Sequence, residues 1–164
     1  MSATARARQD PQDWDGARFG RILLATEGRP IPEAAIRRVI ELADPHGASV
    51  RVLSIARVHG TSFGMPTPGL LPSRDEWRQQ QEIVTKAIKR LKRKGLEADG
   101  HVVGTRKSTK KIVEEATLEE CEAIVMAADP DRPRLIADAM WSQEPQRVRR
   151  KAKVPVFLVP DDAG

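Results

Sequence analysis

The sequence predicts an α/β fold of the doubly wound, Rossmann-like class, in which helices cover both faces of a five-stranded parallel sheet. Short runs rich in β-branched residues alternate with longer stretches of helical period from Arg18 onward, as in β-α units. The first run is almost wholly apolar, as a strand buried on both faces must be. The length of 164 residues suits one domain, which we place at residues 18–160 between a flexible tail at 1–17 and a short tail at 161–164.

The first half of the chain predicts two strands and two helices. A strand over 21–26 stops at a Glu-Gly-Arg-Pro turn, and a helix then opens at Pro32 and keeps one apolar stripe to Ala43. A second strand covers 49–56. The longest helix covers 74–94, because its apolar residues fall within one narrow sector of the helical wheel.

The second half predicts three more strands and two helices, joined by right-handed crossovers. In chain order we expect a strand over 98–103, a helix over 107–118, a strand over 122–128, a helix over 146–152 and a strand over 154–159. Pro155 has no amide hydrogen, so it must lie at the start of the last strand or on an edge without a partner.

Two segments keep neither the helical nor the strand period. Residues 58–72 hold three glycines and three prolines, and we expect a long loop there. Residues 129–145 are interrupted by Pro130, Pro133 and Pro145, which leaves room for only a short helical stretch.

These elements, taken in order, resemble the universal stress protein family over residues 19–160. The resemblance rests on four stretches at matching spacing. They are Ile22 to Gly28, Val50 to Ile55, Gly104-Thr105 with Ile112 to Ala116 and Glu122 to Met126, and Lys151 to Val159. It implies a sheet of strand order 3-2-1-4-5 and a homodimer that pairs through the last strand. The apolar residues of that strand, which would aggregate if left bare, are Val156, Phe157, Leu158 and Val159.

Many members of this family bind ATP, and the resemblance implies a site at the carboxyl ends of the strands, where the strand order reverses. The ATP-binding members carry Gly-x2-Gly-x9-Gly-[Ser/Thr] after the fourth strand. Such glycines let backbone amides approach phosphates without a Cβ in the way. This chain has no glycine from Thr105 through Ala163, so the motif is absent in every register.

Residues at the carboxyl ends of the strands would still line a crevice there, and several of them have two interpretations. The candidates are Thr26, Glu27, Gly28, Ile55, Met126, Ala127, Arg132, Arg134 and Ser142. Ile55 could contact an adenine but is equally a core residue, which we favour, and Ser142 could bind phosphate but is better explained as a helix cap. Arg132 and Arg134, with Arg106 nearby, could bind an anion by their side chains; otherwise they are solvated loop cations.

Other kinds of site find little support in the sequence. The three histidines and the single Cys121 have no metal-ligand spacing, and no serine lies in a nucleophile-elbow sequence. The net charge of +5 comes largely from basic clusters at 86–94, 106–111 and 147–153. None contains an aromatic residue, so we expect solvated helix faces and no nucleic-acid binding.

The sequence therefore favours a regulatory or interaction protein of the stress response that is not an enzyme. No apolar stretch resembles a signal peptide or a membrane span, so we expect a cytoplasmic location. We expect a homodimer, with a further protein partner left open, and no metal or cofactor. The alternative is an adenine-nucleotide binder, for ATP or AMP, with an arginine-assisted phosphate site.

Overall fold

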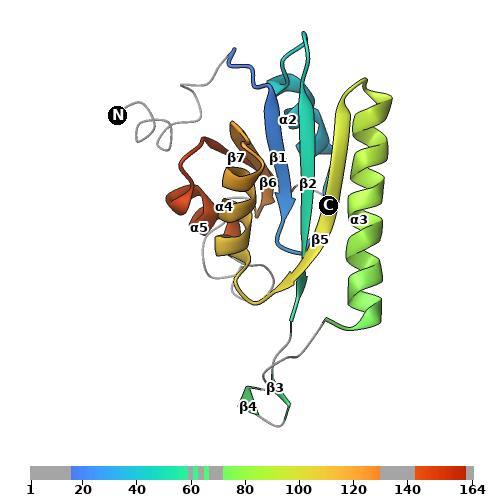
Figure 1. Ribbon diagram of the computed structural model, residues 1–164, viewed down its shortest axis with the longest axis vertical. Coiled ribbons are helices and arrows are strands. Elements are labelled where there is room, and N and C mark those ends of the chain that lie inside the picture. Colours follow the sequence, from blue (N-terminus) through green and yellow to red (C-terminus); the bar gives the residue numbers. More distant parts are fainter. Residues whose placement is uncertain (1–15, 59–60, 63–64, 67–71, 130–142, 162–164) are drawn as a thin grey trace.

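Five parallel strands form the centre of this computed structural model, which describes residues 16–58, 61–62, 65–66, 72–129 and 143–161 (Figure 1). The strands are β1 (Arg21–Thr26), β2 (Ser49–Arg57), β5 (Glu97–Thr105), β6 (Ala123–Ala128) and β7 (Val156–Pro160). The helices are α2 (Glu33–Leu42), α3 (Arg74–Arg93), α4 (Ser108–Leu118) and α5 (Glu144–Lys151). The strand order β5-β2-β1-β6-β7 confirms the predicted order 3-2-1-4-5.

Two apolar layers lie on opposite faces of this sheet because successive strand residues point to opposite sides. On one face, Ile22 and Leu24 of β1 pack with the buried residues of α2 and α3. On the other face, Leu23 and Ala25 pack with Ile112 of α4 and with α5. Helices thus cover both faces, as predicted. In the part of the chain that the structure describes, no helix is long and apolar enough to cross a membrane.

Helix α3 shows why the sequence located its ends well. The Ser73 hydroxyl accepts a hydrogen bond from the amide of Glu76 at 3.1 Å, which caps the first turn. Basic residues occupy the last turn, where they interact favourably with the helix dipole. Gly95 then adopts a φ of +84°, a left-handed conformation that glycine takes without a steric penalty.

The structure also differs from the sequence expectations in places. The segment 58–72 contains a small antiparallel pair, β3 (Thr61–Ser62) with β4 (Met65–Pro66), which is too short to give a periodic pattern. Strand β5 is longer than the predicted 98–103, and α5 begins at Glu144 because Pro145 is well tolerated in a first helical turn. The last strand begins at Val156, two residues after the predicted start at 154, and Pro155 immediately precedes it. Residues 1–15, 130–142 and 162–164 lie outside the described residues.

The point where the strand order reverses lies at β1. This strand pairs with β2 on one side and with β6 on the other, and all three run parallel. The chain first adds strands on the β2 side, then crosses to add β6 and β7. The turn after β1 and the residue that follows β6 therefore meet at the carboxyl edge of the sheet.

Gly100 of β5 provides a test of the sheet packing. A Cβ added at this position would lie 2.4 Å from the carbonyl oxygen of Val52, the residue opposite it in β2. We expect Gly100→Ala to reduce the free energy of unfolding by about 1–3 kcal/mol, because backbone atoms must move to admit the methyl group. Urea denaturation measures this loss.

Gly20→Ala is the matched control for that substitution. Its Cβ would meet only Oε1 of Glu122, the far end of a flexible side chain. Its effect should be smaller than that of Gly100→Ala. Equal stability of the Gly100→Ala variant and the parent chain would contradict the close approach of β5 to β2.

Candidate functional site

The turn that follows β1 is held by hydrogen bonds within itself. The Thr26 hydroxyl donates to the carbonyl oxygen of Arg29 at 2.6 Å and accepts from the amide of Gly28 at 3.2 Å. Gly28 has a φ of +127°, and a Cβ there would lie 3.3 Å from the carbonyl oxygen of Ile55. Glycine is therefore required at this position both for its backbone conformation and for its closeness to β2.

Two neighbouring elements fix the same turn from outside. The Gln80 side chain, buried on α3, donates from Nε2 to the carbonyl oxygen of Gly28 at 3.0 Å and accepts a hydrogen bond from the Ser54 hydroxyl. Arg57, the last residue of β2, donates from Nε to the carbonyl oxygen of Glu27 at 3.0 Å. Backbone oxygens of the turn are thus already satisfied by α3 and β2.

The Arg29 guanidinium spans the point where the strand order reverses. Its Nε lies 2.5 Å from Oε1 of Glu27, and its Nη1 lies 3.0 Å from Oδ1 of Asp129, which directly follows β6. The side chains of Glu27 and Arg29 are only 1% and 2% exposed, while that of Asp129 is 33% exposed. The chain therefore places its own buried cation between two carboxylates at the carboxyl edge of the sheet.

Burial dominates the electrostatics of Glu27. It raises the pKa of this carboxyl above the ordinary value, and the charge and hydrogen bond of Arg29, with a smaller effect of Arg57, offset the shift only in part. Oε2 of Glu27 has no hydrogen-bond partner among the described residues. Arg29 thus provides most of the interaction that offsets the cost of removing the Glu27 carboxyl from solvent.

The predicted crevice residues fall into three groups. Thr26, Glu27 and Gly28 come together in the turn just described. Ile55, Met126 and Ala127 are buried, and Ile55 and Met126 belong to the apolar core on the α4 and α5 face. Arg132, Arg134 and Ser142 lie outside the described residues.

Sequence reasoning missed the four residues that hold the turn in place. They are Arg29, Arg57, Gln80 and Asp129. A basic residue two positions after an acidic one at a strand end was the available signal for Arg29. Nothing in the helical pattern of α3 distinguishes Gln80 from the exposed glutamines beside it.

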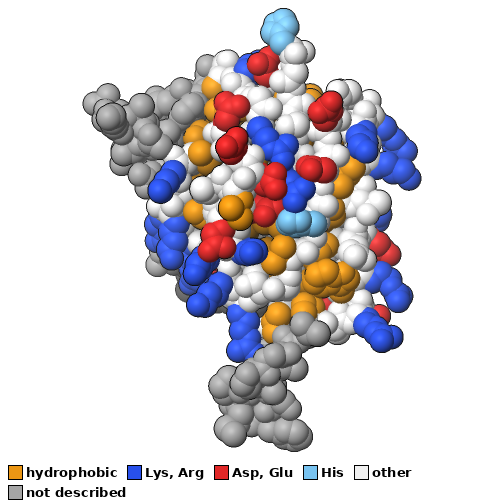
Figure 2. Space-filling model, in the orientation of Figure 1, with side chains coloured by type: hydrophobic (Ala, Val, Ile, Leu, Met, Phe, Trp, Pro, Cys, Tyr) orange, Lys and Arg blue, Asp and Glu red, His pale blue; other side chains and the backbone are white. Residues whose placement is uncertain are grey.

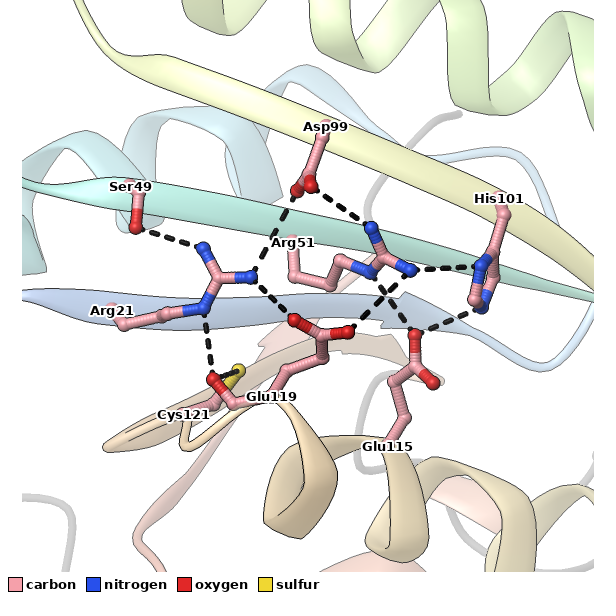
Figure 3. A network of polar contacts seen from close by, with 8 residues as sticks. All are labelled: Arg21, Ser49, Arg51, Asp99, His101, Glu115, Glu119 and Cys121. Atoms are coloured by element: carbon pink, nitrogen blue, oxygen red, sulfur yellow. Dashed lines mark hydrogen bonds and ion pairs between the residues drawn. The ribbon is translucent and has the colours of Figure 1, made fainter.

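A second polar cluster lies where α4 meets the sheet (Figure 3). Arg21 Nη2 lies 2.8 Å from Oε2 of Glu119, and Arg51 Nε lies 3.1 Å from Oε2 of Glu115. Arg51 also reaches Asp99 at 2.9 Å. The arginines of β1 and β2 thereby connect β5 to the last turns of α4.

His101 takes a defined role in this cluster. Its Nδ1 lies 2.8 Å from Nη2 of Arg51, which can only donate, so Nδ1 accepts and the hydrogen is on Nε2. Nε2 in turn lies 2.8 Å from Oε2 of Glu115, a buried carboxylate. Nε2 makes no hydrogen bond among the described residues despite this closeness, so Arg51, which donates from Nε to Oε2 of Glu115, is what makes the buried carboxylate of α4 tolerable.

Cys121 borders this cluster and is chemically quiet. Burial raises the pKa of its thiol to about 11, so very little of the nucleophilic thiolate exists at neutral pH. Within the described ranges, no group of three or more His, Cys, Asp or Glu side chains could hold a metal ion.

Comparison with known proteins identifies a family. The family model described as the universal stress protein family matches residues 18–160. A universal stress protein structure from Archaeoglobus fulgidus is 19% identical, with a TM-score of 0.63, and the match covers 90% of this chain and 98% of that one. A member of the family from Burkholderia pseudomallei is 20% identical, with a TM-score of 0.62 and coverage of 87% and 96%.

A further match is described as the universal stress protein from Archaeoglobus fulgidus in complex with dAMP. It is 20% identical, has a TM-score of 0.59, and the match covers 85% of this chain and 96% of that chain. No curated protein matches the chain. At these identities the structural likeness shows the fold.

Arg29→Met tests the buried bridge. The substitution leaves Glu27 and Asp129 without the cation between them, and we expect it to lower the free energy of unfolding at pH 7 by about 3–5 kcal/mol. A buried carboxyl with a raised pKa stabilises the folded state below its unfolded pKa and loses that contribution as the pH rises through the folded pKa. The loss caused by Arg29→Met should therefore shrink toward pH 4, as measured by urea denaturation at both pH values.

Arg37→Met is the control, because Arg37 is an exposed residue of α2. Its effect should be small at either pH. Equal losses for the two variants, or a loss for Arg29→Met that grows as the pH falls, would contradict the bridge.

Proposed function

Because the chain belongs to the universal stress protein family, we propose that it is a cytoplasmic stress-response protein that regulates or interacts with other proteins. In this proposal it acts as a homodimer, is not an enzyme, and does not hold ATP in the crevice at the carboxyl ends of β1 and β6.

The observation that carries this proposal is the position of Arg29. A nucleotide entering between β1 and β6 would have to displace a guanidinium that is 2% exposed and pairs with Glu27 and Asp129. Removing either ion pair without an equal replacement leaves a buried charge uncompensated. The free energy gained from contacts with a nucleotide would therefore be offset by the cost of breaking the ion pairs of Arg29.

The chemistry of the loops after the strands supports the same proposal. The stretch from Thr105 through Ala163 contains no glycine, so backbone amides cannot approach phosphates as they do in a glycine-rich loop. Asp129 adds a negative charge at the carboxyl end of β6 and is already paired with Arg29. A phosphate at this edge would meet repulsion in place of open amides.

The alternative function is binding of an adenine nucleotide, ATP or AMP, with Arg132, Arg134 and Ser142 as the phosphate ligands. The observation that favours it is the described complex of an Archaeoglobus fulgidus relative with dAMP. The turn Thr26 to Gly28 has the right place in the fold for a base or ribose contact.

Copurification and titration separate the two functions. We expect mass spectrometry to find no nucleotide in protein purified without added ligand, since Arg29 occupies the edge of the sheet. We expect calorimetry to show no binding of AMP at millimolar concentration, and no binding of ATP that exceeds binding of inorganic triphosphate. The relative solved with dAMP serves as the positive control in the same buffers. Binding that depends on adenosine would establish the alternative.

The homodimer proposal rests on β7. This strand ends the sheet and carries the predicted residues Val156 to Val159, of which Val156, Phe157 and Val159 are buried by the chain's own helices. Their burial leaves the main-chain edge of β7 as the part of the strand that a second copy could extend. Because the next residue in sequence, Pro160, has no amide hydrogen, pairing must centre on Val156 to Val159.

Sedimentation velocity and light scattering over a range of micromolar concentrations test this assembly. We expect a mass of two chains that falls toward one chain only on dilution. A strict monomer throughout that range would contradict pairing through β7.

A further inference from the structure

The described surface is hollowed between the start of α4 and the exposed side of α5. The hollow has a volume of about 680 Å³, and both helices line it. Six of its lining residues are basic, three at the start of α4 and three on α5. They are Arg106, Lys107, Lys110, Arg147, Arg150 and Lys151. A hollow of this volume lies within the range of small-ligand sites.

The positive charge of the hollow is only partly compensated. Glu144 is the single acidic residue among those described as lining it, and its carboxylate accepts a hydrogen bond from the Thr109 hydroxyl and pairs with Arg147 at 3.2 Å. In the described part of the chain, Lys107, Arg150 and Lys151 have no carboxylate within ion-pair distance. The hollow thus has a concentrated excess of cations, which attracts an anion.

The beginning of α4 adds donors to these cations. Lys107 precedes the helix without a side-chain hydrogen bond that caps it, so first-turn amide hydrogens are available to an acceptor. Ser108 also lines the hollow, is only 8% exposed, and its hydroxyl has no hydrogen-bond partner among the described residues. The hydroxyl of this largely buried residue is therefore a donor that a ligand in the hollow would satisfy.

This arrangement departs from the sequence expectation that the basic clusters are separate solvated faces. The clusters at 106–111 and 147–153 are far apart in sequence, yet α4 and α5 pack against each other and bring them together. Figure 2 shows Lys and Arg side chains gathered over these two helices. Cations of two different helices therefore converge on one concave surface, whereas separate solvated helix faces would not bring them together.

We infer that the hollow between α4 and α5 binds a small anion that carries several linked phosphate groups. Arg106, Arg147 and Arg150 suit the geometry of phosphate oxygens, and Lys107, Lys110 and Lys151 supply further charge. The described lining residues include no aromatic side chain on which a base could stack, and the surface is concave, which favours a compact anion over a nucleic-acid strand. The inference goes beyond the proposed function and concerns a different set of residues from the crevice, although Arg106, which the sequence placed near the crevice, lines this hollow.

Calorimetric titration with inorganic triphosphate tests the inference in the full chain. We expect saturable binding that is tighter than that of inorganic phosphate and weakens as the NaCl concentration rises. Lys107→Ala/Arg150→Ala should weaken binding by about tenfold or more, since two charge-assisted contacts are lost. Ser108→Ala should weaken binding without changing its salt dependence, because a hydroxyl carries no charge.

The control variant is Lys89→Ala/Lys92→Ala, which removes two exposed cations of α3 and alters the net charge equally. It should bind triphosphate like the parent chain. Equal weakening by the two double variants would show general charge attraction and overturn the inference, as would the absence of saturable binding.

Two further ligands distinguish this site from other possibilities. ATP and inorganic triphosphate should compete for the hollow, while AMP should not displace triphosphate. AMP binding that survives in Lys107→Ala/Arg150→Ala would instead contradict the proposed function and leave the hollow unaffected. A single-stranded oligonucleotide should not bind more tightly than triphosphate. If it binds through these residues and excess triphosphate does not displace it, the ligand is a nucleic acid and the inference is overturned.

Discussion

The guanidinium of Arg29 is the constraint on which the carboxyl edge of the sheet depends. A cation buried to this degree is stable only with partners in fixed places, so Glu27 must turn inward after β1 and Asp129 must follow β6 directly. The turn that achieves this needs Gly28 in a left-handed conformation and receives hydrogen bonds from Arg57 and Gln80. One ion bridge therefore connects β1 to β6 and, through the turn, to β2 and α3.

The opposite, amino-terminal half of the sheet is organised by a different compensation. On the α4 side, the carboxyl half of β2 contributes Leu53 and Ile55 to the apolar layer. The amino-terminal halves of β2 and β5 carry Arg51, Asp99 and His101 instead. Arg51 and His101 reach across from this face to the buried carboxylate of Glu115, and Arg21 reaches Glu119 (Figure 3). These contacts hold the last turns of α4 against the strands. The helix is thus anchored at its carboxyl end, and its first turn is left to face α5.

The sequence predicts the elements and layers because they depend on local periodicity and apolar runs. The ends of α3 follow from Ser73 and Gly95. The predicted strand order follows from the resemblance to a family, and the structure confirms this order. The site is harder because its contacts join residues far apart in sequence. Arg29 reaches Asp129 across one hundred positions, and Arg51 reaches Glu115 across 64. No periodic pattern encodes which of several arginines turns inward, and the rotation of α4 against α5, which unites two basic clusters, depends on core packing.

The crevice and the hollow between α4 and α5 differ in how their charges are compensated. At the crevice each buried charge has a partner within the chain, so a ligand there competes with contacts that already exist. Between α4 and α5 the reverse holds, because several cations and the Ser108 hydroxyl face a hollow with one carboxylate, itself engaged by Thr109 and Arg147. On these charges an anion would be attracted more strongly to the hollow than to the crevice. The absence of glycine from Thr105 through Ala163 and the cations on α5 are consistent with one another, because side chains can attract phosphates where backbone amides are not free to approach them.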